Sequence, residues 1–471
     1  MPRAGLRALV LLALLATAAA APASATATGG PASAVAAVGA AAAPAAPTTA
    51  AGAAARWTDA VVATTLDNGL RVLLLEDHRS PIVSFQVWYR VGSRNEPRGA
   101  TGLAHFLEHM MFKGTPRYGP REYARLVEQH GGRDNAFTTQ DVTSYFVDIV
   151  ADRLDLVLDL EADRMQHLLL DPAAVDAERQ VILEERRTRT EDDPGGLLGE
   201  EVSALAFHVH PYGQPTVGWA EDVQRITADQ LRAFYRTYYV PNNALIVAVG
   251  AFRASELLAR IRERFGAIPR GPDPPPVTAV EPPQRGERRV VLRRPARLPI
   301  VYLAWHVPDH RSPDAPALEV LAQVLAGGRA SRLHRRLVYE RQLALDAGSD
   351  YPYFSLDPNL FWCWATAMPG QTPEAVEQAL LVEIERLATE PVTEEELTRA
   401  RNQVEAAFVF AQDSVHRRAS LLARFELLGG YALADAYLAR LAAVTAADLQ
   451  RVARTWLAPD RRTVGVLVPT P

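Results

Sequence analysis

The sequence predicts an α+β fold built as two similar halves. Three observations lead to this prediction: a long-range repeat, a proline-rich stretch between the two copies, and runs of β-forming residues alternating with helical patterns. The repeat keeps one offset of 218 residues; the matching pairs include Thr227-Ala228 with Thr445-Ala446, Leu231 with Leu449, Pro241 with Pro459, Ile82-Val83 with Ile300-Val301, and Leu103-Ala104 with Leu321-Ala322. A constant offset over so many positions indicates duplication of one structural unit.

The first copy supplies the strands and helices on which the α+β class depends. Residues 143–150 alternate, and Tyr145, Val147 and Ile149 fall on one face, as expected for a strand with one buried side. Further β-rich runs and helical patterns complete the prediction, with strands at 70–76 and 82–91 and helices at 152–170, 173–190 and 227–239.

A proline-rich linker separates the copies. Residues 269–286 include Pro274-Pro275-Pro276, and such a run favours an extended, semi-rigid chain. We therefore expect a first domain at 56–268 and a second domain at 287–471.

The N-terminal region has the features of a targeting sequence. Arg3 and Arg7 are the only charges among the first 55 residues, and residues 6–21 are almost wholly Leu, Val, Ala and Thr. This pattern predicts a secretory signal peptide at 1–25 and then an Ala/Pro/Thr-rich disordered tether at 26–55. The expected location is secreted or periplasmic in a bacterium. The alternative is a mitochondrial presequence and hence the mitochondrial matrix, but a presequence is typically Arg-rich and amphipathic.

Charge and hydropathy exclude two classes of partner. The formal net charge is −5 with both signs mixed along the chain, so no basic stripe predicts a nucleic-acid partner. The apolar N-terminal run is too short to span a bilayer well and no second run follows it. We therefore expect no transmembrane segment in the mature chain.

One short motif points to metal chemistry. His105-Phe106-Leu107-Glu108-His109 places two imidazoles at i and i+4, on one face of a helix, where both can hold the same metal ion. Glu108 is close enough to act as a base toward a water at that ion. The alternative is a pair of surface histidines beside a solvated glutamate, but the residues on both sides of the motif are apolar, which a solvated face would not need.

The surrounding sequence resembles the M16 metallopeptidases, a family that includes pitrilysin, insulysin and the mitochondrial processing peptidase. Residues 102–115 resemble the family's core motif, and the resemblance covers about residues 60–468, as in a short bacterial-type subunit. The other matching segments are Leu66 to Val72, Asn135 to Thr138 with Asp141, Thr143 and Tyr145, His210 to Gly213, and Tyr239 to Asn243.

The resemblance implies a fold and a reaction. Members of this family have two similar halves, each a β-sheet covered by helices, which close like a clam around the substrate. The implied activity is zinc-dependent endopeptidase cleavage of peptides or unfolded polypeptides, with Glu108 as the catalytic base and His105 and His109 as metal ligands. The implied cofactor is one Zn²⁺ per chain.

The family also implies a third ligand, a glutamate about 75 residues after the second histidine. Glu184 and Glu185 both fall in range. The family's Glu-Arg pattern maps onto Glu178, Arg179 and Glu185, and residues seven apart face the same way on a helix. We therefore assign Glu185 as the ligand and expect Glu178 to orient the site.

The second half is expected to lack a metal site. Adding 218 to the site positions gives Gln323, Ala326, Gly327 and Gln403, which cannot rebuild it. The resemblance assigns substrate binding to the first half, at Asn135, Ala136, Phe137 and Thr138, where a peptide would pair with a strand.

One departure from the family concerns its partners. Many M16 enzymes carry an Arg and a Tyr, seven residues apart, in the second half, where they bind substrate; here Val338 and Leu345 hold those positions. We therefore expect a second M16 subunit, in a heterodimer or a homodimer, to complete the site. The alternative function is a non-catalytic assembly or binding protein that keeps the fold, but the intact ligand and base set argues against it.

Overall fold

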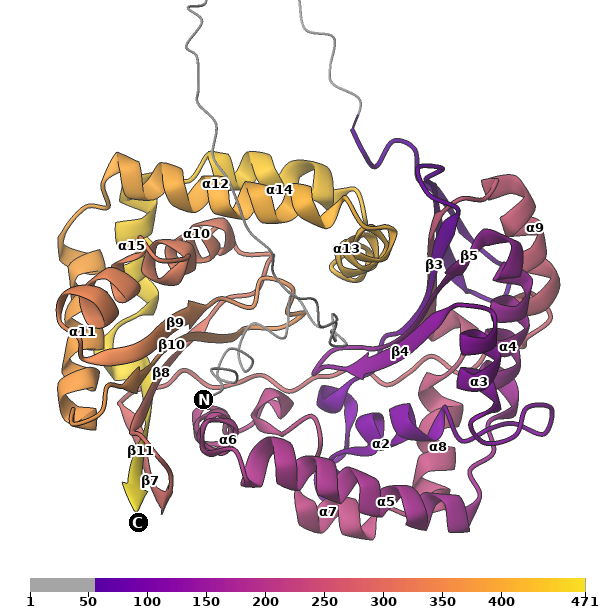
Figure 1. The fold of residues 1–471 in the computed structure, drawn as a ribbon, viewed down its shortest axis with the longest axis horizontal. Coiled ribbons are helices and arrows are strands. Elements are labelled where there is room, and N and C mark those ends of the chain that lie inside the picture. Colours follow the sequence, from indigo (N-terminus) through magenta and orange to yellow (C-terminus); the bar gives the residue numbers. More distant parts are fainter. Residues whose placement is uncertain (1–55, 471) are drawn as a thin grey trace, which may run out of the picture. The chain divides into compact units, whose positions relative to one another are not determined.

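Two β-sheets organise residues 56–470, the part of the chain that the computed structural model describes (Figure 1). The first sheet has six strands in the order β1-β2-β6-β3-β5-β4. These strands are β1 Val62–Thr65, β2 Arg71–Glu76, β3 Ile82–Tyr89, β4 Arg133–Thr138, β5 Thr143–Val150 and β6 Ala244–Gly250.

The second sheet has five strands in the order β7-β11-β8-β10-β9. These strands are β7 Arg288–Pro295, β8 Ile300–Val307, β9 Ala344–Asp350, β10 Asn359–Ala367 and β11 Arg462–Thr470. In both sheets the last strand of the half lies between a parallel and an antiparallel neighbour: β6 pairs with β2 and β3, and β11 pairs with β7 and β8.

Helices follow the strands in both halves. Those of the first half are α2 Leu103–Met110, α3 Glu122–Gln129, α4 Leu154–His167, α5 Pro172–Arg186, α6 Pro194–Ala206, α7 Ala220–Arg225, α8 Ala228–Tyr238 and α9 Ala254–Phe265. Those of the second half are α10 Ala315–Ala326, α11 Pro373–Thr389, α12 Glu394–Ala411, α13 Val415–Leu427, α14 Leu433–Ala442 and α15 Ala446–Trp456.

The prediction of an α+β fold with two similar halves is confirmed. The strands expected at 70–76, 82–91 and 143–150 are β2, β3 and β5, and the expected helices are α4, α5 and α8. The helix predicted for 173–190 changes character near its end, because α5 stops at Arg186 and a π-helical segment, Arg187–Glu191, follows. The repeat also preserves helix capping: Thr227 caps α8 and Thr445 caps α15, each in a capping box.

One helix of the first half packs on the second sheet. Leu198 and Val202 of α6 are fully buried in a cluster with Tyr302, Ala304 and Leu467 of that sheet. The approach is close at β11, where a Cβ on Gly465 would lie 2.3 Å from a methyl carbon of Val202. Glycine at this position therefore lets α6 lie directly on the strand.

The reciprocal contact comes from α13 of the second half, which lies against β3 and β6 of the first sheet (Figure 1). Its contacts with that sheet include polar ones. The side-chain amide of Gln86, buried in β3, donates to the carbonyl oxygen of His416 and to Ser420 Oγ, and Arg418 Nη1 lies 2.8 Å from Asp77 Oδ2. Helix α13 lies about 218 residues after α6 in the chain, so the duplicated halves exchange equivalent helices.

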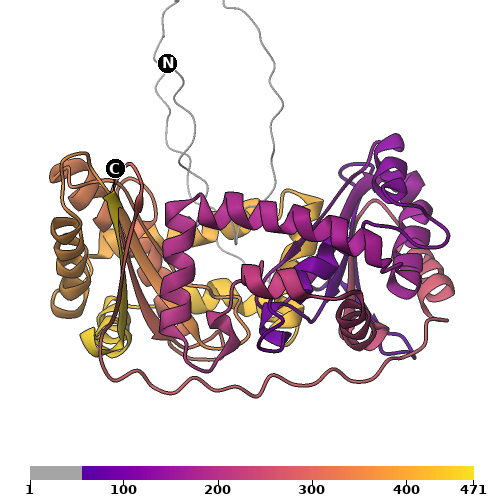
Figure 2. The ribbon, with the colours of Figure 1, turned by 90° about the horizontal axis from the view of Figure 1, so that it is seen from below.

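The predicted signal peptide at 1–25 and tether at 26–55 lie outside the described residues. Within the described part, none of the helices has the length and apolar character needed to cross a membrane. Residues 269–286 contain no helix or strand, and Figure 2 shows this segment running in extended form along the lower edge of the view, from the first half to the second.

Candidate metal centre

Helix α2, which carries the histidine motif, has a fixed starting point. Gly102 precedes it with φ of 93°, and a Cβ there would lie 2.6 Å from the carbonyl oxygen of Val217, so the position requires glycine. The buried carboxylate of Glu96 accepts hydrogen bonds from the backbone N–H groups of Gly102 and Ala104, both at 2.7 Å. These contacts satisfy free donors of the first turn and hold the helix in place.

Helix α5 presents two of its glutamates to α2. It begins with an Asp171 cap and Pro172 in its first turn, a combination that favours helix initiation. Glu178 and Glu185 both contact His109 of α2. Glu184, the other candidate ligand, points into solvent and pairs with Arg187 at 2.6 Å.

Three side chains converge between the two helices. Nε2 of His109 lies 3.2 Å from Glu185 Oε2, and Nε2 of His105 lies 3.7 Å from Glu185 Oε1. All three potential ligand atoms are within 4.8 Å of one another. Tetrahedral zinc with ligands at 2.0–2.2 Å separates its ligand atoms by about 3.3 Å. The donor set, two imidazoles and a carboxylate, and its spacing therefore fit a zinc ion.

The opposite face of the His109 ring is also held. Its Nδ1 lies 2.8 Å from Glu178 Oε1, and the other oxygen of Glu178 pairs with Lys113. A carboxylate at Nδ1 fixes the ring orientation and leaves Nε2 toward Glu185, an arrangement common behind metal-binding histidines. His105 lacks such support, since its buried Nδ1 has no hydrogen-bond partner among the described residues.

The charges at this cluster are strongly coupled. Burial and, to a smaller extent, the charge of His109 lower the pKa of His105 to about 4, although the nearby Glu185 carboxylate opposes this shift. Burial alone would lower the pKa of His109 too, but its hydrogen bonds to Glu178 and Glu185 raise it to about 9. Burial would raise the pKa of Glu185, yet the hydrogen bond to His109 and the nearby positive charges lower it to about 2. A cation held by these residues would take the place of the proton on His109.

Glu108 lies on the same helix and is held by the edge strand of the sheet. Thr138 Oγ1 donates to Glu108 Oε2 at 2.5 Å. Burial raises the pKa of Glu108 to about 7, although the hydrogen bond from Thr138 opposes that shift. A carboxylate with a pKa near neutrality is well matched to proton transfer.

The predicted substrate segment is strand β4. Asn135, Ala136, Phe137 and Thr138 all lie on it, and β4 pairs with β5 alone at the edge of the first sheet. Phe137 packs edge-on against Trp88 with ring centroids 5.3 Å apart. The strand beside Glu108 therefore has one edge without a partner strand in the described part of the chain.

Comparisons with known proteins agree with this arrangement. Two family profiles match in sequence order: "Insulinase (Peptidase family M16)" over residues 71–219 and "Peptidase M16 inactive domain" over residues 225–404. The chain is 30% identical over 411 residues to the zinc protease PqqE of Helicobacter pylori, covering 86% of this chain and 92% of that protein. The chain belongs to peptidase family M16.

Solved structures support the family assignment. The crystal structure of a protease from Helicobacter pylori superimposes on this M16 chain with a TM-score of 0.84 at 30% identity, covering 87% of this chain and 99% of that one. The periplasmic protease PqqL of Escherichia coli shares the fold, with a TM-score of 0.73 at 21% identity over 89% of this chain and 48% of that one.

Sequence reasoning missed three residues around the centre of this M16 protein. Glu96 caps α2, Lys113 pairs with Glu178, and Arg189 Nη1 lies 2.5 Å from Glu185 Oε1. The spacing of Arg189, four residues after Glu185 on a helical pattern, was a signal that could have found it. Glu96 and Lys113 meet their partners through contacts that local patterns do not reveal.

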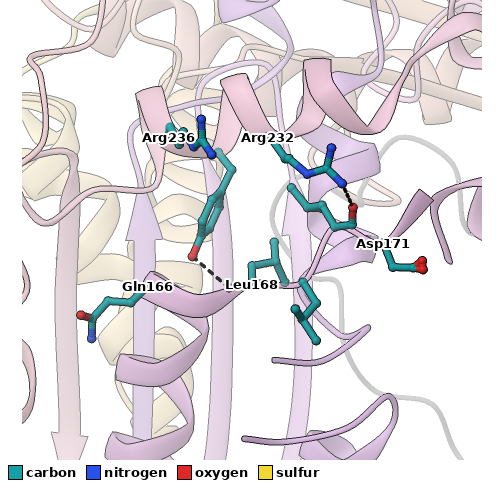
Figure 3. Close-up of a pocket in the computed structure, with 8 residues that line it drawn as sticks. Gln166, Leu168, Asp171, Arg232 and Arg236 are labelled. Atoms are coloured by element: carbon teal, nitrogen blue, oxygen red, sulfur yellow. Dashed lines mark hydrogen bonds between the residues drawn. The ribbon is translucent and has the colours of Figure 1, made fainter. Parts of the chain in front are cut away.

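A separate cavity of about 440 Å³ lies between the α4–α5 connection and α8 (Figure 3). Arg232 donates to the carbonyl oxygen of Leu170 at 2.6 Å, and Tyr235 Oη accepts from the N–H of Leu168 at 3.4 Å. These polar groups of the lining already support the connection between two helices, so the cavity has a structural explanation.

Proposed function

We propose that this chain is a zinc endopeptidase that hydrolyses peptides or unfolded polypeptides. The observation that carries the proposal is the convergence of His105, His109 and Glu185, with Glu108 one residue from a ligand and held by Thr138. The name of the Helicobacter relative, a zinc protease, supports the same conclusion.

Each residue then has a role. Zinc, held by His105 Nε2, His109 Nε2 and the Glu185 carboxylate, would polarise the scissile carbonyl and lower the pKa of a water molecule. Glu108 takes the proton from the attacking water at its carboxylate and passes it to the nitrogen of the leaving amine. Thr138 fixes one carboxylate oxygen of Glu108, so the other is directed to the proton. Glu178 orients the imidazole of His109.

We propose that the substrate binds as an extra strand along β4, through Asn135, Ala136, Phe137 and Thr138. The unpaired edge of β4 offers backbone donors and acceptors to an extended peptide. Main-chain pairing tolerates many sequences, which suits a peptidase acting on unfolded chains.

We propose that a second M16 subunit contributes to the complete enzyme. Val338 and Leu345 occupy the positions of the family's Arg and Tyr, and neither side chain donates a hydrogen bond to a developing oxyanion. A partner subunit carrying the pair would supply those donors. Activity of the purified chain that is already high, and unchanged in Val338→Arg plus Leu345→Tyr, would argue against this partner.

The proposed organisation follows the sequence. Residues 1–25 act as a signal peptide for secretion or export to the periplasm, and 26–55 act as a tether. The metal-bearing domain is 56–268, the linker is 269–286, and the domain without metal ligands is 287–471. The described periplasmic location of PqqL, a protein with the same fold, is compatible with export.

Metal analysis of two neighbouring variants tests the centre. Glu185→Gln should lose zinc, whereas the matched control Glu184→Gln should keep one zinc per chain, because Glu184 faces solvent and pairs with Arg187. Zinc retained in Glu185→Gln and lost in Glu184→Gln would show that the wrong carboxylate is assigned. A chain that binds zinc but hydrolyses no polypeptide, alone or with an M16 partner, would instead favour the assembly-protein alternative.

A further inference from the structure

The second sheet lacks one strand that the first sheet has. The orders β2-β6-β3-β5-β4 and β7-β11-β8-β10-β9 correspond strand for strand, and β1 is left over in the first half. Strand β1 pairs antiparallel with β2 from Val62↔Leu74 to Thr65↔Arg71. The counterpart of β2 is β7, which pairs with β11 alone among the described strands.

The residues of the second half that correspond to β1 form no strand and make other contacts. By the 218-residue offset of the repeat, β1 corresponds to residues 280–283, which include Glu281, Pro282 and Pro283. The Glu281 carboxylate accepts hydrogen bonds from three consecutive backbone N–H groups, those of residues 208–210, at 2.8–2.9 Å. The prolines have no N–H to donate to a strand ladder. Among residues 56–470, the outer edge of β7 therefore has no partner strand.

Strand β7 and the residues that flank it carry a strong positive charge. Residues 285–297 contain six arginines and one acidic residue, Glu287. Arg288 donates to the carbonyl oxygens of Leu205 and Ala206, and Arg289 pairs with Glu287 and Glu377. The other four make no ion pair within the described residues; they are Arg285, Arg293, Arg294 and Arg297.

Exposure also distinguishes β7 from its counterpart. Val72 to Leu75 of β2 are fully buried, whereas β7 alternates between half-buried and exposed positions and Val291 is 42% exposed. Arginines at a sheet edge discourage pairing with another copy of the same edge, because like charges would face each other. The same charges favour a strand that carries carboxylates.

We propose that the edge of β7 is a docking site for an extended acidic segment of a partner polypeptide, which adds as a strand where β1 lies in the first half. Backbone groups of β7 would provide the pairing, and Arg293 and Arg297 would select the acidic side chains. The chain's own residues 22–55 contain no charged residue, so they lack this complementarity. The site is independent of the metal centre.

A peptide-binding experiment tests the proposal. The probe is a fluorescein-labelled peptide of about eight residues with alternating Glu and Val, measured by polarisation against the full chain carrying Glu108→Gln to prevent cleavage. The comparison probes are the same peptide with Lys for Glu, and the Glu peptide N-methylated on alternate amides so that it cannot form a ladder. The protein variants are Arg293→Glu plus Arg297→Glu, with Arg236→Glu, an exposed arginine of α8, as the matched control.

The proposal predicts saturable binding of the Glu peptide, at least about tenfold weaker in the double variant and within about twofold of the parent in the control. N-methylation should abolish binding, and added salt should weaken it. Circular dichroism and thermal unfolding confirm that the variants fold. Absence of saturable binding, equal binding of the Lys peptide, or indifference to N-methylation would overturn the proposal. A concentration-dependent dimer that the double variant abolishes would also overturn it, in favour of a second copy.

Discussion

The two halves share a fold but differ in what lies between their equivalent helices. In the first half, two histidines and a glutamate face one another across α2 and α5. In the second half, the equivalent positions are Gln323, Gly327 and Gln403. A Cβ on Gly327 would lie 2.3 Å from Gln403 Oε1 and 2.8 Å from Gln323 Oε1. Two amide groups therefore occupy the space that a histidine side chain at position 327 would need.

The two exchanged helices, α6 and α13, also differ in how each contacts the sheet of the other half. Helix α6 packs on the second sheet through an apolar cluster, and its last backbone carbonyls accept hydrogen bonds from Arg288 and His306. Helix α13 meets the first half through ion pairs of its side chains as well. Arg71 of β2 reaches Glu426 at 2.7 Å, and His416 lies 3.2 Å from Asp148. Ion pairs weaken with added salt and when their carboxylates are protonated, so the α13 contact should be the more sensitive of the two to salt and acid.

The largest effect is expected from removing the proposed catalytic base, which only the first half carries. Glu108→Gln should reduce kcat/KM for an unfolded polypeptide by at least about 100-fold, because the amide cannot accept the proton. Zinc content should not change, since Glu108 is not among the three proposed ligands. Glu128→Gln, an exposed residue of α3, is the control and should keep full activity. Near-normal turnover in Glu108→Gln would contradict the proposed mechanism.

The next largest effect is a loss of stability from weakening the apolar contact between α6 and the second sheet. Leu198→Ala removes a fully buried side chain of α6 and should lower the free energy of unfolding by about 2–5 kcal/mol. Urea titration at neutral pH measures it, with the exposed Leu433→Ala as a control expected to change stability little. The loss should be the same at pH 3 and pH 7, because no titrating group is removed.

A smaller and pH-dependent loss of stability is expected from removing the Asp77 carboxylate, which Arg418 of α13 contacts. Hydrogen bonds from Arg79, with those from Arg418, lower the pKa of Asp77 from 3.8 to about 2. Because the folded pKa lies below the unfolded value, this stabilisation is present above pH 3.8 and is lost as the pH falls toward 2. Asp77→Asn should therefore cost about 1–3 kcal/mol at pH 7 and progressively less in acid. A cost that stays constant down to pH 2 would exclude this role.

The smallest effect is expected from removing the hydrogen bond that Thr138 donates to the proposed base, Glu108. Thr138→Val removes the donor to Glu108 and should lower kcat/KM about tenfold, the scale of one hydrogen bond to a charged group. Thr138→Ser keeps the hydroxyl and should retain most activity. Equal losses in the two variants would mean that the methyl group, and not the hydrogen bond, matters at this position.

The features that could be predicted from the sequence are those that depend on local periodicity and on the internal repeat. The face shared by Glu178 and Glu185 followed from helix geometry, and both residues contact His109. The exchange of α6 and α13 was not predicted, because an amphipathic pattern indicates that one face of a helix is buried but not which sheet it packs against. Glu96 was missed for a different reason: it lies outside the motif, and no sequence pattern links its carboxylate to the N–H groups of Gly102 and Ala104, six and eight residues later.

The helix exchange also decides when this protein can fold during synthesis. Helix α6 needs β11, whose residues begin more than 250 positions later, and the first sheet needs α13 to cover β3 and β6. Neither half can therefore reach its final packing on the ribosome before almost the whole chain has emerged. Contacts this distant in sequence slow folding and leave apolar surfaces open in the meantime. A chain cut before residue 415 would keep every residue of the metal centre and still expose the uncovered face of its sheet.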